Sequence, residues 1–291
     1  MTAARRSYPF NHGRGDVISY PVTVDGVRTR VVEGGAEGTV LICLHGVGSR
    51  ADRFIPTIPG LVAAGFHVFA IDFPGHGFAD KRAEIDYRPQ AFAAFVGGVL
   101  DELGLSGVHI AGTSLGGLVA SRLACDRPDL VAGLVLIGTM GIAPLAEADM
   151  VPPINVGDGS EPAVRRKFSF LVSDPAMIAD SWVREESMIN SSVGAREALM
   201  SATKHLNEQS NADIQDARLR ELRPDIPLLL VWGENDRWTP IGMGHEAHAL
   251  MPGSSLVVMS GCGHAPYFED PDTFVSVVHD FINPPEGTSY E

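Results

Sequence analysis

The stretch with the clearest chemical character is Gly112-Thr113-Ser114-Leu115-Gly116. A short apolar run of strand character precedes it, and apolar residues at helical spacing follow it until Pro128 ends the pattern. This order predicts a strand, a sharp turn and a helix, with the Ser114 hydroxyl presented at the turn as a nucleophile. The two glycines that flank the serine lack Cβ atoms, which lets the strand and the helix approach each other closely.

A serine hydroxyl is a weak nucleophile near neutral pH, so it needs a base and a third group that orients the base. Asp236 follows the apolar run Pro227–Trp232, and His264 follows the next such run, Ser255–Met259. The ends of successive parallel strands meet at one edge of a sheet, where we expect both side chains beside Ser114. We predict that His264 Nε2 accepts the Ser114 proton while Asp236 holds the Nδ1–H group.

Two backbone N–H groups are expected to stabilise an oxyanion formed on the substrate. One is that of Leu115, at the first turn of the helix behind the serine. The other comes from the loop His45-Gly46-Val47-Gly48 after the apolar strand Val40–Leu44, with the Val47 N–H as the favoured donor and Gly46 as its neighbour.

Three other titratable residues lie near these motifs and need an interpretation. Glu234 lies two residues before Asp236 and is the alternative acid, but it is nearer the strand, so Asp236 is favoured. His45 and His76 border the expected pocket, and we interpret both as residues that shape their loops.

Composition excludes several classes of function. The 291 residues include 22 basic and 36 acidic side chains, a formal net charge of -14, and the basic residues cluster only in short pieces such as Arg165-Arg166-Lys167. This balance argues against nucleic acid and membrane surfaces as partners. Three scattered cysteines, the lack of metal-ligand spacing and the lack of a glycine-rich phosphate loop predict that no metal or cofactor is used. The first 16 residues have no apolar signal core, so we expect a cytoplasmic protein.

Strand-like runs alternate with helical stretches through most of the chain, which predicts an α/β fold: a mostly parallel eight-stranded sheet with helices on both faces. Between Gly138 and about Arg223 the strand pattern stops, and amphipathic helices are expected at Glu161–Leu171, Pro175–Asn190 and Gly194–Leu206. We therefore predict a core formed by residues 1–139 and 223–291, with residues 140–222 inserted as a helical cap.

Over nearly its whole length the chain resembles the α/β-hydrolases. The motifs that carry this resemblance are His45-Gly46, Asp72-Phe73-Pro74-Gly75-His76-Gly77, Gly112-Thr113-Ser114-Leu115-Gly116-Gly117, Gly233-Glu234-Asn235-Asp236 and Gly263-His264. Within this superfamily, Ile71–Lys81 and Phe170–Pro175 resemble the meta-cleavage-product hydrolases, which cleave a carbon–carbon bond in vinylogous 1,5-diketones from aromatic-ring degradation. The resemblance implies a dienoate-type keto acid as substrate and, in many members, a homo-oligomer.

The chain departs from that subgroup at three positions. Members commonly carry Asn where this chain has Thr113, Trp where it has Ala265, and a cap-helix Arg for the substrate carboxylate where it has Glu186. Arg184 and Arg53 are the candidates for that charge, because a guanidinium binds a carboxylate through two parallel hydrogen bonds. The other candidate substrate contacts, which neighbour the triad or the loop donors, are Gly46, Thr113 and Trp238.

These observations favour a cofactor-independent serine hydrolase that acts on a small-molecule carbonyl substrate. Two reactions remain open: cleavage of a carbon–carbon bond in a ring-fission dienoate, and hydrolysis of a carboxylic ester, lactone or thioester by the same groups. A third interpretation is a small-molecule receptor of the same fold, which repeated turnover would exclude. On this fold, epoxide and haloalkane hydrolysis resembles chemistry with a carboxylate nucleophile. Because position 114 is a serine, the sequence argues against these two reactions.

Overall fold

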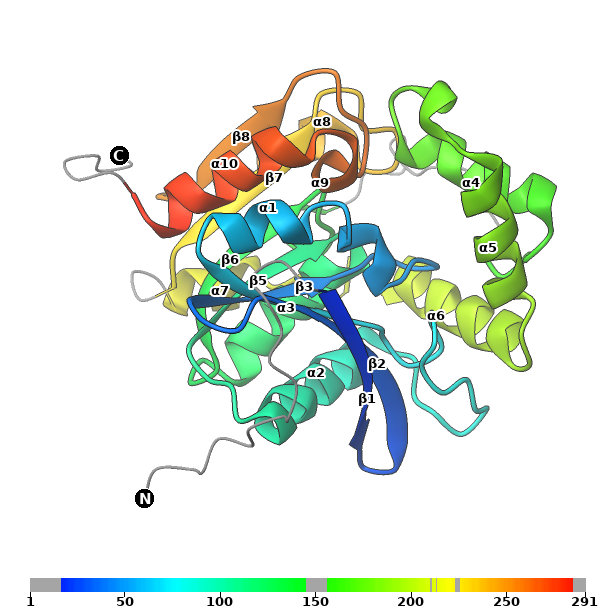
Figure 1. Cartoon of the computed structure of the whole chain (residues 1–291). Coiled ribbons are helices and arrows are strands. Elements are labelled where there is room, and N and C mark those ends of the chain that lie inside the picture. The colour runs from blue at the N-terminus through cyan, green and yellow to red at the C-terminus, as the bar shows by residue number, and fades with distance from the viewer. Residues whose placement is uncertain (1–16, 145–155, 210, 213, 223–225, 285–291) are drawn as a thin grey trace.

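A single eight-stranded sheet organises the molecule (Figure 1). The computed structural model describes residues 17–144, 156–209, 211–212, 214–222 and 226–284. The strand order is β1-β2-β4-β3-β5-β6-β7-β8, and every neighbouring pair from β4 to β8 is parallel. The predicted α/β fold is confirmed. The strands are β1 Val17–Val24, β2 Val27–Gly34, β3 Thr39–Leu44, β4 Phe66–Ile71, β5 Val108–Thr113, β6 Val131–Ile137, β7 Leu228–Gly233 and β8 Ser255–Met259.

The antiparallel part of the sheet begins with a tight hairpin. β1 and β2 pair antiparallel, and β2 also pairs antiparallel with β4. The two residues between the strands, Asp25 and Gly26, have φ values of 48° and 75°. Positive φ at both positions is the signature of a primed turn, whose twist matches that of the strands. An Asp-Gly pair between two strand-forming runs is typical of such a hairpin.

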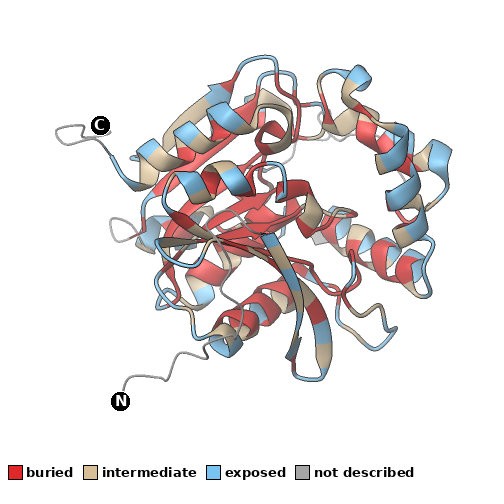
Figure 2. Cartoon of the chain, viewed as in Figure 1, coloured by how far each residue is buried: buried red, intermediate tan, exposed pale blue. Residues whose placement is uncertain are grey.

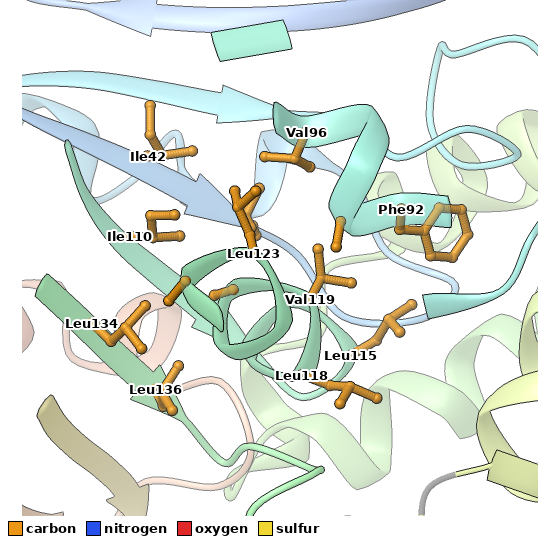
Figure 3. Close-up of a cluster of buried hydrophobic side chains, with 14 of the residues drawn as sticks. Ile42, Phe92, Val96, Ile110, Leu115, Leu118, Val119, Leu123, Leu134 and Leu136 are labelled. Carbon is orange, nitrogen blue, oxygen red and sulfur yellow. The ribbon is translucent and has the colours of Figure 1, made fainter. Parts of the chain in front are cut away.

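Alternate residues of the central strands face two separate apolar cores. In β6, Leu134 and Leu136 belong to one buried cluster, whereas Val135 and Ile137 belong to the other. This period of two is expected of a sheet that is covered on both faces. Helices α2 Pro89–Leu103 and α3 Leu115–Asp126 cover the first face (Figure 3), and α1 Ile58–Ala63 and α10 Pro271–Ile282 cover the second. Buried residues accordingly concentrate in the sheet and on the inner faces of these helices (Figure 2).

Three helices between β6 and β7 lie to one side of the sheet (Figure 1): α4 Glu161–Leu171, α5 Asp180–Asn190 and α6 Ala195–Gln209. The α4–α5 region has a small apolar cluster of its own, formed by Val164, Phe168, Val172, Ile178 and Val183. In contrast, α6 and the following α7 Asp216–Leu222 contribute their apolar residues to the main core. The cap bounds at 140 and 222 stay a prediction, and residues 145–155 of the segment lie outside the described part.

Several local elements differ from the expected ones. Between β3 and β4 the chain forms a 3-10 turn, η1 Ala51–Phe54, and then the separate helix α1. Pro59 explains the break, because it has no N–H to donate to Ile55 and it fits the first turn of a new helix. The helix expected from Pro175 begins as the 3-10 turn η3 Pro175–Met177 and continues as α5. Two short helices were not predicted, α7 and α9 Pro266–Glu269, and α8 Ile241–Leu250 connects β7 to β8.

None of the helices in the described ranges is long and apolar enough to cross a membrane.

Candidate active site

Ser114 lies in the turn between β5 and α3 with φ 54° and ψ -116°. It is one of two non-glycine residues with positive φ in the described part of the chain, so its backbone is strained. Its N–H donates to the Ile137 carbonyl at 3.0 Å, which ties the turn to β6. A Cβ on Gly116 would lie 2.3 Å from the Leu44 carbonyl oxygen, so only glycine allows this approach of helix and strand.

His264 and Asp236 form a buried pair near the carboxyl ends of β8 and β7. His264 Nδ1 lies 2.7 Å from Asp236 Oδ2, and the two residues are 4% and 7% exposed. Asp236 Oδ1 also accepts from the backbone N–H groups of Trp238 and Thr239, at 2.8 and 2.9 Å. These donors fix the plane of the carboxylate, so its other oxygen faces the imidazole. The arrangement leaves His264 Nε2 as the ring nitrogen available to a substrate or a nucleophile.

Glu234, the alternative acid, has different partners. Its Oε2 accepts from the Ser260 hydroxyl at 2.8 Å and from the Gly261 N–H at 3.0 Å. Because Asp236 holds the His264 ring, the geometry favours Asp236 over Glu234.

The loop after β3 lies directly beside Ser114. A Cβ on Gly46 would be 3.3 Å from Ser114 Cβ and 3.9 Å from its Oγ. The Gly46 carbonyl accepts from the Ser49 N–H at 3.2 Å and lies 2.8 Å from His45 Nδ1. In a trans peptide the C=O and N–H groups point in opposite directions, so the Val47 N–H points away from these partners. Leu115 is the first residue of α3, and its N–H has no acceptor within that helix.

His45 and His76 are both buried, as expected of residues that shape their loops. His45 Nε2 accepts from the Phe73 N–H at 3.0 Å, so Nδ1 carries the proton that is donated to the Gly46 carbonyl. Burial lowers the pKa of His45 to about 4 and that of His76 to about 3. Both imidazoles are therefore neutral near pH 7, and His45 fixes the peptide that bears the Val47 N–H.

Ser114 and His264 line one pocket, together with residues from α4, α5 and α9. Five of the other residues expected in the site also line it: Gly46, Val47, Arg53, Thr113 and Trp238. Most of the wall is apolar or aromatic, which is typical of small-molecule sites. The apolar and aromatic residues from the α4–α5 region and from α9 are Phe168, Leu171, Val172, Ile178, Trp182, Tyr267 and Phe268.

One part of the wall carries a buried cluster of charged side chains that the sequence pattern did not predict. Glu186 of α5 is 2% exposed and forms ion pairs with Arg50, Arg53 and Lys167. Arg53 Nη2 lies 2.7 Å from Glu186 Oε2, and Lys167 Nζ also donates to the Gly48 carbonyl at 2.6 Å. Arg53, Lys167 and Glu186 line the pocket.

The pKa shifts in this cluster reflect burial and mutual attraction. Burial alone would raise the pKa of the Glu186 carboxyl, but Lys167, Arg53 and Arg50 hold it well below its ordinary value. Burial lowers the pKa of the Lys167 ammonium, against the opposing attraction of Glu186. A signal for Lys167 was present in the sequence: it lies on the apolar stripe of α4, between Val164 and Phe168, where a solvated lysine is not expected.

Arg184, one of the two arginines expected to hold a substrate carboxylate, does not reach the pocket. Its side chain is exposed, whereas Trp182 and Glu186 of the same helix line the pocket. Residues four apart share a helix face, and the residue midway between them lies on the opposite side. The expected role of Arg184 is therefore wrong on geometric grounds, and Arg53 is the arginine in the wall.

The described residues include no cluster of three or more His, Cys, Asp or Glu side chains that could hold a metal ion.

Comparison with protein families decides the assignment. Residues 39–271 match the alpha/beta hydrolase fold family. The chain belongs to this family. It is 30% identical over 259 residues to the 2-hydroxy-6-oxononadienedioate/2-hydroxy-6-oxononatrienedioate hydrolase of Cupriavidus pinatubonensis, covering 85% of this chain and 88% of the relative. A hydrolase of the same name from Pseudomonas putida, numbered 2, is 32% identical over 260 residues, with 85% and 88% coverage. This alpha/beta hydrolase is thus an enzyme of the hydrolase class, and the predicted resemblance to meta-cleavage-product hydrolases is confirmed.

Solved structures share the fold at lower identity. A bacterial membrane phospholipase A superposes with a TM-score of 0.82 at 23% identity, over 92% of this chain and 86% of that one. The meta-cleavage product hydrolase of Pseudomonas fluorescens IP01 gives a TM-score of 0.79 at 24% identity, over 91% and 97%. At these identities the structural likeness establishes the fold of this alpha/beta hydrolase only.

Proposed function

We propose that this alpha/beta hydrolase is a serine hydrolase that cleaves a carbon–carbon bond in a ring-fission keto acid of aromatic degradation. One observation carries the proposal: the strained Ser114 and the Asp236-held His264 line the same largely apolar pocket. A nucleophile, an oriented base and an apolar binding wall are the parts that acyl transfer requires.

In the proposed reaction, Ser114 Oγ attacks the substrate ketone as His264 Nε2 accepts its proton. Asp236 stabilises the imidazolium that forms. The N–H groups of Val47 and Leu115 hold the negative charge on the former carbonyl oxygen, and each such donor is worth roughly 3 kcal/mol. Collapse of this oxyanion breaks the carbon–carbon bond and leaves the acyl group on Ser114, while the departing fragment leaves as an enolate that takes the proton from the His264 imidazolium. Water, deprotonated by the neutral His264, then releases the acyl fragment from Ser114 as a carboxylate.

Cleavage of a carbon–carbon bond needs one additional step before the attack. The dienol form of a ring-fission product must first take a proton on carbon to become the ketone, so that the departing fragment can carry the electron pair of the broken bond. His264 is the proposed participant in this transfer. Overall, water is added across the bond: one fragment becomes a carboxylic acid and the other gains a hydrogen.

The named relatives support this choice of reaction. Enzymes 30% and 32% identical to this chain are named for hydrolysis of 2-hydroxy-6-oxononadienedioate and 2-hydroxy-6-oxononatrienedioate. These compounds are enol-keto dicarboxylates, the substrate class that the proposed reaction requires.

A second candidate is hydrolysis of a carboxylic ester, lactone or thioester. Three replacements favour it: Thr113, Ala265 and Glu186 stand where the resemblance leads one to expect Asn, Trp and the carboxylate-binding Arg. The same nucleophile, base and oxyanion donors would serve this reaction without the initial proton transfer to carbon.

Steady-state kinetics on two substrates separate the candidates. The purified protein is assayed on 2-hydroxy-6-oxononadienedioate, followed by loss of its dienol absorbance, and on a short-chain 4-nitrophenyl ester. We expect efficient dienedioate cleavage that Ser114→Ala reduces by about 10³-fold or more. Fast ester cleavage with no loss of the dienedioate would assign the protein to the esterases.

A further inference from the structure

We propose that Arg53 and Lys167 form a carboxylate subsite in the cap-side wall of the pocket, with Glu186 as its built-in counter-charge. The inference rests on the proposed function in that it concerns the substrate of the same pocket. The proposed subsite does not lie where the resemblance would place it. Members of the resembling subgroup bind the substrate carboxylate with a cap-helix Arg, and this chain has Glu186 at that position.

The balance of buried charge beside the pocket favours an anionic ligand. Four cationic side chains, Arg30, Arg50, Arg53 and Lys167, meet in one ion-pair network with three carboxylates, Asp52, Asp72 and Glu186, and all seven side chains are at most 17% exposed. Apart from the half-exposed Glu185, which also pairs with Arg50, these seven buried side chains carry one positive charge in excess.

The neighbouring Glu185 does not cancel this charge inside the pocket. It lies 3.1 Å from Arg50 Nη2, but its side chain is 48% exposed and screened by water. Uncompensated charge in a buried site costs free energy, which an anionic ligand in the pocket would recover.

Hydrogen bonds within the described residues use only part of the donor capacity of Arg53 and Lys167. Arg53 is 9% exposed, and its Nε atom is buried with no hydrogen-bond partner among the described residues. Within those residues, Lys167 Nζ donates to the Gly48 carbonyl and to Glu186, which uses two of its three N–H groups. The described residues therefore leave part of the hydrogen-bonding capacity of both cations unused.

The two cations are held in place before any ligand binds. The Arg53 guanidinium stacks on the Phe168 ring, with Cζ 4.6 Å from the ring centroid, and its Nη2 is bonded to Glu186. Lys167 is fixed by the same carboxylate and by the loop after β3. Preorganised cations lose little side-chain entropy on binding, so a single carboxylate gains most of the interaction energy.

A matched pair of substrates tests the subsite. The 4-nitrophenyl monoesters of dicarboxylic acids from succinate to pimelate are compared with the 4-nitrophenyl esters of monocarboxylic acids of equal carbon number. The quantity measured is the ratio of kcat/KM for the acidic ester to that for the neutral one. We expect a maximum of this ratio at one chain length, where the free carboxylate reaches Arg53 and Lys167.

Substitutions test whether Arg53 and Lys167 cause the preference for the acidic ester. Arg53→Met and Lys167→Met are each expected to lower the ratio by about tenfold or more, since a hydrogen bond to a charged group is worth roughly 1.5 kcal/mol or more. Lys167→Arg retains the charge and most of the ratio, and Glu186→Gln raises the ratio because it removes the competing carboxylate. Arg184→Met is the matched control. It removes an exposed cation from α5, the helix that carries Glu186, and is expected to leave the ratio unchanged.

Calorimetry with glutarate on the Ser114→Ala protein tests the subsite without catalysis. Binding that weakens in the Lys167→Met background supports the proposal. A flat kinetic ratio in the wild type, or equal ratios in the wild type and both methionine variants, would overturn it while leaving the serine hydrolase assignment intact. Turnover of neither ester series nor of 2-hydroxy-6-oxononadienedioate, together with glutarate binding that weakens in the Lys167→Met background, would instead contradict the proposed function and retain the subsite.

Discussion

Two residue-level features set the chemistry of this hydrolase: a serine held in a strained conformation and an imidazole held by a carboxylate. Both depend on backbone geometry more than on side-chain packing. Ser114 keeps its positive φ because glycine at position 116 permits α3 to lie against the end of β3.

The first prediction concerns this close approach. In Gly116→Ala the new Cβ would meet the Leu44 carbonyl oxygen at 2.3 Å, a backbone atom that cannot rotate away. We expect the free energy of unfolding to fall by more than about 2 kcal/mol and activity to be lost. Gly242→Ala in α8 is the control, because nothing lies within 4 Å of its added Cβ and alanine favours the helix. Urea denaturation of both variants makes the comparison, and equal stability of the two would show that the elbow tolerates a side chain.

The second prediction separates the two candidate acids. Asp236→Asn preserves shape but removes the carboxylate that faces His264 Nδ1 at 2.7 Å. By analogy with triads in general, kcat should fall by about 10⁴-fold. Glu234→Gln, whose carboxylate contacts Ser260 and Gly261, should change kcat by less than about threefold. The reverse order of effects in steady-state assays would assign the acid to Glu234.

Among single residues, the sequence predicted the catalytic candidates that lie just after the ends of strands. Ser114, Asp236 and His264 were assigned because each comes shortly after an apolar run, and parallel strands bring such positions to one edge. The Arg50–Arg53–Lys167–Glu186 cluster was not assembled, because its ion pairs join the loop after β3 to helices more than 110 positions later. No local pattern specifies which face of α4 meets which face of α5. Arg184 was assigned wrongly for the same reason.

At the scale of elements, the end of α4 is attached to the loop that carries His264. The His264 N–H donates to the Leu171 carbonyl at 2.8 Å. Glu269 of α9 joins the two segments, since its Oε1 accepts from the Gly263 N–H at 2.8 Å and its Oε2 from the Ser173 N–H at 2.6 Å. The position of the histidine is thus coupled to the position of the helices that line the pocket.

The third prediction tests this coupling. Glu269→Ala leaves the Gly263 and Ser173 N–H groups without these acceptors, and each unsatisfied buried group costs about 1–3 kcal/mol. We expect lower stability and a reduced kcat, with Glu269→Gln intermediate because its amide oxygen retains one acceptor. Glu246→Ala, on the exposed face of α8, is the control. Urea denaturation and kcat measured on the same preparations provide the test, and wild-type behaviour of Glu269→Ala would refute the coupling.

Long elements were predictable and short ones were not. The bounds of α2, α4 and α10 follow from apolar periodicity and from a proline in the first turn of each. The seven-residue α7 and the four-residue α9 are too short to show a period, and tertiary packing decides them.

At the scale of the whole molecule, buried neutral histidines make the fold sensitive to acid. His45 and His76 have ring centroids 5.2 Å apart, and burial holds their pKa values at about 4 and about 3, below the ordinary 6.5. Below pH 6.5 the unfolded chain binds protons that the folded protein does not, so stability falls as the pH is lowered towards 4. Each histidine contributes up to about 1.4 kcal/mol per pH unit in that range.

The fourth prediction follows from this proton linkage. The free energy of unfolding should be several kcal/mol lower at pH 5 than at pH 7.5, of which these two histidines supply roughly half or more. His76→Phe keeps an aromatic ring beside Phe92 and removes one of the two groups, so its loss between the two pH values should be smaller. The exposed His245→Gln serves as control. An unchanged pH dependence in His76→Phe would show that other groups dominate the acid sensitivity.

Covalent labelling with a fluorophosphonate, followed by mass spectrometry of the digested protein, tests directly whether Ser114 is the activated nucleophile. If Ser114 is the nucleophile that His264 and Asp236 activate, the label lies on Ser114, and His264→Ala slows labelling by about 100-fold or more. Labelling at another residue, or equal labelling rates in the wild type and His264→Ala, would contradict the account.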